Sequence, residues 1–282
     1  MSRYLNEIAV TQFDRETKHE YQSMGVLRGC FRTRTGVTGN EATFNNMGKG
    51  KAHKRGAPSS DVVPMQVGHT YEKAILEDYE APEYTDLFGK KEVQIDEVSE
   101  LATTTKGAIG RLRDQIAIDQ MVAAPIGDLL GGAIIGDSAA GMSLTTLSKL
   151  RELMDDAEIP DEDRYIAMTP NGFTGLLNET KITSSDFASV KALEQGEINR
   201  FMRFQFKRIG TRAEGGLPLI SAGVQSGYAW DKKAIGEAIG LEVETSVEWS
   251  VDKQSWLSMG KFKGGACVAD PKGLIRFQYK IV

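Results

Sequence analysis

The chain has very few of the residues from which most active sites are built. Its 282 residues include only three histidines and two cysteines. His19, His53 and His69 all lie near the N-terminus, and none stands at metal-ligand spacing from a cysteine or a carboxylate. Cys30 and Cys267 lack the cationic, exposed setting that lowers the pKa of a thiol. The sequence therefore predicts no catalytic residue, no metal site, no cofactor and no enzyme.

Long apolar runs are also missing. The most apolar stretch, 121–135, is too short to span a membrane, and it also contains Pro125, Asp128 and several glycines. The first residues lack the apolar core of a signal peptide, which predicts synthesis in the cytoplasm with free thiols. Lysine and arginine total 34 against 39 aspartates and glutamates, a formal net charge of −5. That balance argues against a dedicated nucleic-acid-binding protein.

What the chain does have is a long charged segment, 28–88, that reads as a two-stranded arm. Its first limb is basic and its second is acidic, and a loop rich in Gly, Ala, Pro and Ser joins them at 49–61. So few large aliphatic side chains cannot offset the entropy of ordering the segment. We therefore expect a neighbouring subunit to order it, with a solvated arm and a nucleic-acid contact as alternatives. The candidate intersubunit contacts are Arg28, Arg32, Arg34, Lys49, Lys51, Lys54, Arg55, Glu72, Glu77, Asp78, Glu80 and Glu83.

Apolar residues spaced three and four apart predict a long amphipathic helix over 95–122, which Pro125 ends. Gly107 and Gly110 inside it predict a bend or a close backbone contact. A second helix is expected after the N-cap Ser143, followed by a buried strand over 164–168.

A third helix is expected from Pro170, and a fourth over 232–240. Alternation over 242–249 and 275–281 predicts a β-rich C-terminus, and thus an α+β fold.

Several motifs, taken in this order, resemble those of the major capsid (coat) proteins of tailed bacteriophages, whose fold is shared with herpesvirus shells and encapsulins. One motif resembles a stretch on the family's long helix: Arg111-Leu112-Arg113-Asp114-Gln115. A later segment of the family is resembled by Tyr165-Ile166-Ala167-Met168-Thr169-Pro170 followed by Leu176-Leu177. Ala234-Ile235-Gly236-Glu237-Ala238 and 265–273 look like its C-terminal segments. The resemblance covers essentially the whole chain.

The resemblance implies a division into four parts. These are an N-terminal arm (1–27), an extended β-hairpin loop (28–92), a peripheral domain with the spine helix and a β-sheet (93–142 and 251–282), and an axial α/β domain (143–250). The extended loop is expected to lie over the adjacent subunit, which agrees with the prediction made from its charges.

The function implied is a virion shell protein that self-assembles through pentamers and hexamers into the icosahedral head around double-stranded DNA. The expected partners are other copies, a scaffolding protein, a portal, a decoration protein, and the packaged DNA by non-specific proximity. Assembly is expected in the bacterial host cytoplasm, without a membrane. The alternatives are an encapsulin-type nanocompartment shell, a minor tail or collar protein, and an enzyme with its site around Thr169, Asn171 and Asp186.

Overall fold

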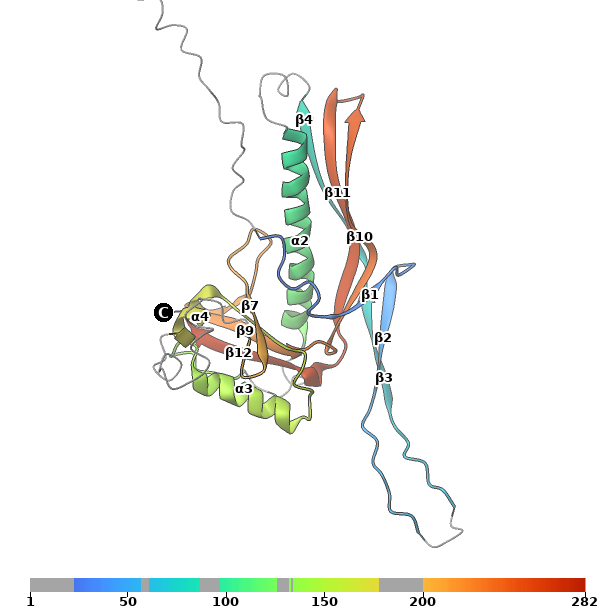
Figure 1. The fold of residues 1–282 in the computed structure, drawn as a ribbon, viewed down its shortest axis with the longest axis vertical. Coiled ribbons are helices and arrows are strands. Elements are labelled where there is room, and N and C mark those ends of the chain that lie inside the picture. Colours follow the sequence, from blue (N-terminus) through green and yellow to red (C-terminus); the bar gives the residue numbers. More distant parts are fainter. Residues whose placement is uncertain are drawn as a thin grey trace, which may run out of the picture.

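A long helix beside a long sheet, a compact α/β module and a protruding hairpin make up the computed structural model (Figure 1). The structure describes residues 23–56, 61–86, 97–125, 132, 134–177 and 200–281. Most of the expected N-terminal arm, 1–22, therefore lies outside the described residues. The mixture of helices and sheets confirms the α+β class.

The predicted long helix is present as α2 (Glu97–Ala123). Ile109, Ile118 and Met121 are buried on the side that faces the sheets. Gly110 lies against the backbone of the N-terminal segment: a Cβ built on it would be 2.2 Å from the carbonyl oxygen of Met24. The expectation of a close backbone contact is therefore confirmed at Gly110.

The long sheet lies along α2 and has the strand order β1-β10-β11-β4. Its strands are β1 (Arg32–Thr35), β10 (Ile235–Ser250), β11 (Ser255–Val268) and β4 (Glu77–Asp86). Strand β1 runs parallel to β10, and the other pairs are antiparallel. The helix packs closely on β11 at Gly260, where a Cβ would be 2.5 Å from both Ile109 and Thr105.

The helix predicted over 232–240 is wrong, because this segment enters β10. Ala234, Ile235, Ala238 and Ile239 are all buried, since β10 has strands on both sides and packed side chains on both faces. A short run of mostly apolar residues is compatible with either a buried helix or a buried strand, so the sequence pattern alone does not tell them apart. The hydrogen bonds offered by β1 and β11 decide between them.

The compact module contains a six-stranded sheet with the order β12-β9-β5-β7-β6, and β8 pairs with β9. Its strands are β5 (Arg164–Met168), β6 (Arg200–Phe201), β7 (Phe204–Arg208), β8 (Leu219–Ser221), β9 (Val224–Asp231) and β12 (Leu274–Lys280). Its helices are α3 (Leu144–Asp156), α4 (Pro170–Leu177) and the short 3-10 turn η3 (Pro271–Gly273). The predicted strand over 164–168 and the helices after Ser143 and from Pro170 are confirmed.

Side-chain contacts at both ends of α3 explain where this helix begins and how the loop after it is held. The Ser143 hydroxyl accepts the Thr146 N–H at 3.2 Å, while Leu147, Leu150 and Met154 are buried against the sheet. The loop after the helix is held by Arg164, whose guanidinium is 1% exposed. It lies 2.7 Å from Asp155 and 3.1 Å from Asp161, and it donates to the Pro160 carbonyl.

The segment expected as a single arm, 28–92, divides between two structures. Only β2 (Glu41–Met47) and β3 (His69–Ile75) form a free-standing hairpin, while β1 and β4 join the long sheet. The root of the hairpin is also better anchored than its composition suggests. Phe44 and Leu76 are buried in a cluster that includes Cys267 of β11, so the hairpin is fixed at its base by its own chain.

The expected domain boundary at residue 250 does not follow the strand pairing either. Strand β10 lies in the long sheet with β11, and β12 lies in the compact sheet beside β9. The chain crosses from one sheet to the other at the η3 turn, where Asp270 accepts the Lys272 N–H. Pairing between strands far apart in sequence, and not position along the chain, determines these boundaries.

A buried carboxylate at the middle of α2 connects three parts of the chain. Asp114 accepts the N–H groups of Val26 at 2.8 Å and Leu27 at 3.0 Å, and it lies 2.7 Å from the Arg212 guanidinium. The two paired side chains are only 3% and 5% exposed. Asp114 therefore holds the N-terminal segment and the loop after β7 on the helix.

The residues beside Asp114 extend this network. Arg111 lies 2.8 Å from Glu214, and Arg113 is paired with Glu237 of β10. Gln115 accepts the Gly216 N–H at 2.7 Å. These contacts give a physical role to each polar residue of the 111–115 segment on which the family resemblance partly rests.

We expect Asp114→Asn to destabilise the fold by about 3 kcal/mol, because it leaves the Arg212 charge buried without its partner. Chemical denaturation of the purified chain measures the change. The control is Asp156→Asn, the same substitution at an exposed position of α3. Equal stabilities of the two variants would show that the buried pair does not support the fold.

Candidate intersubunit surface

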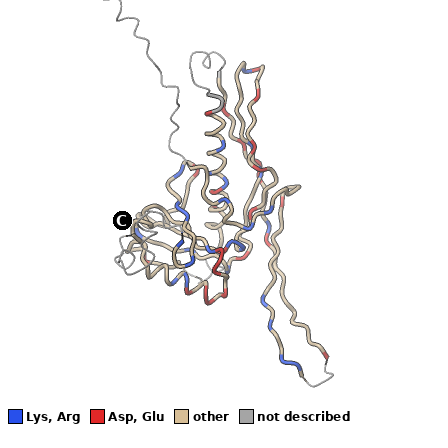
Figure 2. Tube along the Cα trace, viewed as in Figure 1, with Lys and Arg blue, Asp and Glu red and all other residues tan. Residues whose placement is uncertain are grey.

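The candidate contact residues are all exposed, but the structure separates them into distinct regions (Figure 2). Arg28 precedes β1, and Arg32 and Arg34 lie on it. The acidic candidates Glu77, Asp78, Glu80 and Glu83 lie on β4 in the long sheet, and Glu72 lies on β3. The remaining basic candidates, Lys49, Lys51, Lys54 and Arg55, lie beyond β2, where the hairpin extends away from the body.

The outer part of the hairpin makes few contacts with its own chain. The pairing of its limbs ends at the Gly48 N–H, which donates to the Gly68 carbonyl at 2.8 Å. Within the described residues, Lys51, Lys54 and Arg55 form no ion pair. The returning limb exposes apolar side chains, with Val62 93% exposed and Val63 71% exposed. This region thus presents positive charge and apolar surface together.

One ion pair connects the outer hairpin to the compact module. The Lys49 ammonium lies 2.7 Å from the Glu158 carboxylate and donates to the Ala157 carbonyl at 3.3 Å. The hydrogen bond from Lys49 lowers the pKa of Glu158. Both side chains are about three-quarters exposed, at 74% and 75%, so solvent and salt screen the pair strongly.

The acidic strand β4 forms one edge of the long sheet, and two of its acidic residues lie opposite lysines of β11. Asp78 is opposite Lys263 at 3.1 Å, and Glu80 is opposite Lys261. These residues lie on the sheet face turned away from α2, because Gly260 and Phe262 between them face the helix side.

Farther along the same face the surface becomes more apolar. Met259 is opposite Pro82, and Leu257 is opposite Tyr84, which is 40% exposed. The Lys253 ammonium lies 3.9 Å from the centre of the Tyr84 ring. The outer face of the long sheet therefore combines charged side chains of both signs with apolar groups.

The residues most suited to chemistry have structural roles. Cys30 and Cys267 are free and buried, and burial raises the pKa of each thiol to about 11. Neither thiol is exposed, as the sequence predicts. His53 and His69 are exposed, and His19 lies outside the described residues. In the described ranges, no group of three His, Cys, Asp or Glu side chains could hold a metal ion, and no helix is long and apolar enough to cross a membrane.

Thr169, one residue of the alternative enzyme site, makes a structural contact. The Thr169 hydroxyl and N–H both lie 2.9 Å from the Tyr279 hydroxyl oxygen, a contact that joins β5 to β12. Asp186 lies outside the described residues. The acidic cluster at 155–163 likewise supplies partners to Arg164 and Lys49.

Sequence reasoning missed the buried pair of Asp114 with Arg212 and the buried guanidinium of Arg164. One signal could have found the second: Arg164 is a charged residue at the start of an otherwise apolar strand, just after an acidic run. No comparable signal joins Asp114 to Arg212, because they are 98 residues apart.

Comparisons with known proteins identify what the chain is similar to. A family model described as "Phage capsid protein" matches residues 5–281. No curated protein matches significantly. Among solved structures, the capsid of cyanophage P-SCSP1u aligns with a TM-score of 0.76 at 17% identity, covering 97% of this chain and 93% of that chain.

Two other solved structures show the same fold. A structure from Mycobacterium phage Che8 aligns with a TM-score of 0.71 at 14% identity, covering 96% of this chain and 97% of that one. The head structure of Helicobacter pylori bacteriophage KHP40 gives a TM-score of 0.71 at 11% identity, with 100% of both chains covered.

The Lys49 to Glu158 contact makes the exposed hairpin testable by limited proteolysis. We expect Glu158→Gln to increase the rate of tryptic cleavage after Lys51 and Lys54 a few-fold, because the outer hairpin loses its charged link to the module. Mass spectrometry of the fragments measures the rate. Glu152→Gln is the control, since it removes an ion pair with Lys149 within α3. If both variants are cleaved alike, the contact does not restrain the hairpin.

Proposed function

This chain belongs to the phage capsid protein family and is a major capsid protein, and we propose that its copies assemble through pentamers and hexamers into the icosahedral head around double-stranded DNA. The observation that carries this assignment is the family match over residues 5–281. The encapsulin alternative is not favoured, because the matching family is that of phage capsids. The burial of both cysteine thiols also agrees with a structural role without catalysis.

The contact between subunits is proposed to join the outer hairpin of one copy to the outer face of the long sheet in the next. The hairpin extends away from its own long sheet, so the two complementary surfaces of one copy lie apart (Figure 1). Opposite charge favours their encounter, and the exposed Val62 and Val63 supply apolar contact area. Because the two surfaces differ, the contact is heterologous and closes into rings by rotation.

The features of β4 fit a strand that must meet one partner and reject others. An unpaired sheet edge invites uncontrolled pairing between copies, and charged side chains and proline oppose it. Strand β4 carries Glu77, Asp78, Glu80 and Glu83, together with Pro82. Of these, Asp78, Glu80 and Pro82 lie on the outer face and support a contact made through side chains there.

The further partners follow from this role and are part of the proposal. A scaffolding protein guides assembly, a portal occupies one vertex, and a decoration protein binds the outer shell. Packaged DNA lies near the inner wall by non-specific proximity, which suits a chain with a net charge of −5. Assembly takes place in the cytoplasm of the bacterial host.

Electron microscopy and sedimentation of the chain, expressed alone and with a scaffolding protein, test the assignment. We expect closed shells, or rings of five and six copies. Uniform closed shells without a scaffold would favour a nanocompartment, and a stable monomer under both conditions would contradict the proposal.

The charged contact predicts a second result. We expect the triple variant Lys51→Glu, Lys54→Glu, Arg55→Glu to remain folded and fail to form shells, because its hairpin would repel the acidic sheet. Sedimentation measures assembly, and thermal unfolding verifies the fold. Adding Asp78→Lys and Glu80→Lys to the same chain should partly restore shells.

The matched control for this variant reverses three other exposed lysines, Lys106, Lys149 and Lys280. It changes the net charge equally and should assemble. Raising the salt concentration should weaken wild-type assembly, since exposed charges are screened over about 8 Å at physiological ionic strength. Normal shells from the triple variant would show that the hairpin contact is not electrostatic.

A further inference from the structure

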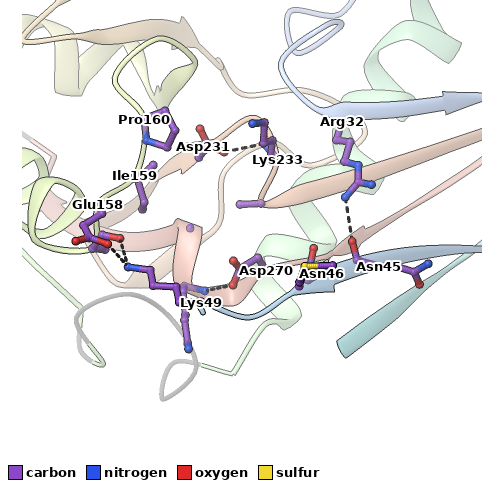
Figure 3. Close-up of a pocket in the computed structure, with 15 residues that line it drawn as sticks. Arg32, Asn45, Asn46, Lys49, Glu158, Ile159, Pro160, Asp231, Lys233 and Asp270 are labelled. Atoms are coloured by element: carbon purple, nitrogen blue, oxygen red, sulfur yellow. Dashed lines mark hydrogen bonds and ion pairs between the residues drawn. The ribbon is translucent and has the colours of Figure 1, made fainter. Parts of the chain in front are cut away.

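A cleft lies between the hairpin and the compact module (Figure 3). Strand β2 and the residue Lys49 form one wall, and the loop after α3, 157–160, forms the other. The turn that connects β9 to β10 and the η3 turn close its base. The cavity has a volume of about 560 Å³, enough for a short stretch of extended polypeptide.

The lining of this cleft has four cationic and three acidic side chains, a net charge of +1, and each acid has a contact within the chain. Glu158 is paired with Lys49 at 2.7 Å. Asp231 accepts the Lys233 backbone N–H at 2.9 Å, and Asp270 accepts the Lys272 backbone N–H at 3.0 Å. The four cationic side chains of the lining are Arg32, Lys49, Lys233 and Lys272.

Three of these cations are available to a ligand. Arg32, Lys233 and Lys272 are exposed and form no ion pair within the described part of the chain. The Arg32 guanidinium is already oriented, because it donates to the Asn45 carbonyl at 3.4 Å and lies 5.6 Å from the centre of the Phe44 ring. The planar guanidinium of arginine is pre-organised, so less entropy is lost for each hydrogen bond that it forms with a carboxylate.

The walls also offer apolar contacts. Met47 is 72% exposed on the hairpin side, and Ile159 and Pro160 line the opposite wall. A surface that combines fixed cations with apolar side chains suits a peptide with acidic and apolar residues. We propose that this cleft is a docking site for an extended acidic segment of a partner protein.

Two other occupants fit the cleft less well. A DNA duplex cannot enter a cavity of this size. A second copy offers its acidic strand β4, but that strand is held in the long sheet and is already proposed to meet the outer hairpin.

Occupation of the cleft would also act on the hairpin. A carboxylate of the bound segment competes with Glu158 for Lys49, whose ion pair crosses one end of the cleft (Figure 3). Binding therefore loosens the contact between the hairpin and the module. The partner would thus influence the direction of the same hairpin that is proposed to join neighbouring copies.

Fluorescence anisotropy with the full chain in its unassembled form tests the site. The probe is a short labelled peptide of alternating glutamate and alanine, and its comparison peptide has glutamine in place of glutamate. We expect Lys233→Glu with Lys272→Glu to weaken binding of the acidic peptide at least tenfold. The control variant, Lys106→Glu with Lys280→Glu, changes the net charge equally outside the cleft and should bind like the wild type.

Three results would overturn the proposal: no binding of the acidic peptide by the wild type, equal binding of the glutamine peptide, or equal losses in the two variants. If a labelled single-stranded oligonucleotide binds through Lys233 and Lys272 and the peptide does not, the ligand of the cleft is a nucleic acid and not a protein. Crosslinking of Lys233 to another copy, without peptide binding, would instead identify a contact between copies. Because the readout is binding to unassembled chain, failure here leaves the shell assignment unaffected.

Discussion

The buried contact of Asp114 with Arg212 is the constraint on which the arrangement of this subunit depends. It brings the N-terminal segment and the loop after β7 to the same turn of α2. The neighbouring Arg113 also attaches α2 to β10, through its ion pair with Glu237. Desolvation offsets much of what the attraction in such a buried pair provides, but removal of one partner leaves the other charge buried and unpaired.

Close backbone packing completes what the charges position. The helix meets the N-terminal segment at Gly110 and meets β11 at Gly260, where any side chain would collide with a neighbour. At Gly265 a Cβ would lie within van der Waals overlap of the Ile75 carbonyl, so the hairpin root also depends on a missing side chain. The subunit is thus closely packed around α2, with one hairpin extending from it.

The separation of buried from exposed charges has a consequence for assembly. The body satisfies its buried charges internally, whereas the outer hairpin and the outer sheet face keep exposed charges of opposite sign. Since a single exposed ion pair such as Lys49 to Glu158 is weak, the proposed contact between copies needs many such pairs acting together with apolar contact. Weak and numerous contacts suit a shell that must correct errors while it grows.

The amino-acid sequence by itself determined the elements whose signals are local. The period of α2, the cap at Ser143 and the apolar strand from Arg164 all appear as expected, because propensity, capping and packing agree there. The charged arm was also visible, and the order of the motifs identified the family. Only the tertiary structure decided that 232–240 is largely strand, that β4 leaves the arm for the long sheet, and that β12 joins β9. These outcomes depend on hydrogen bonds between segments far apart in the chain, which no local pattern encodes.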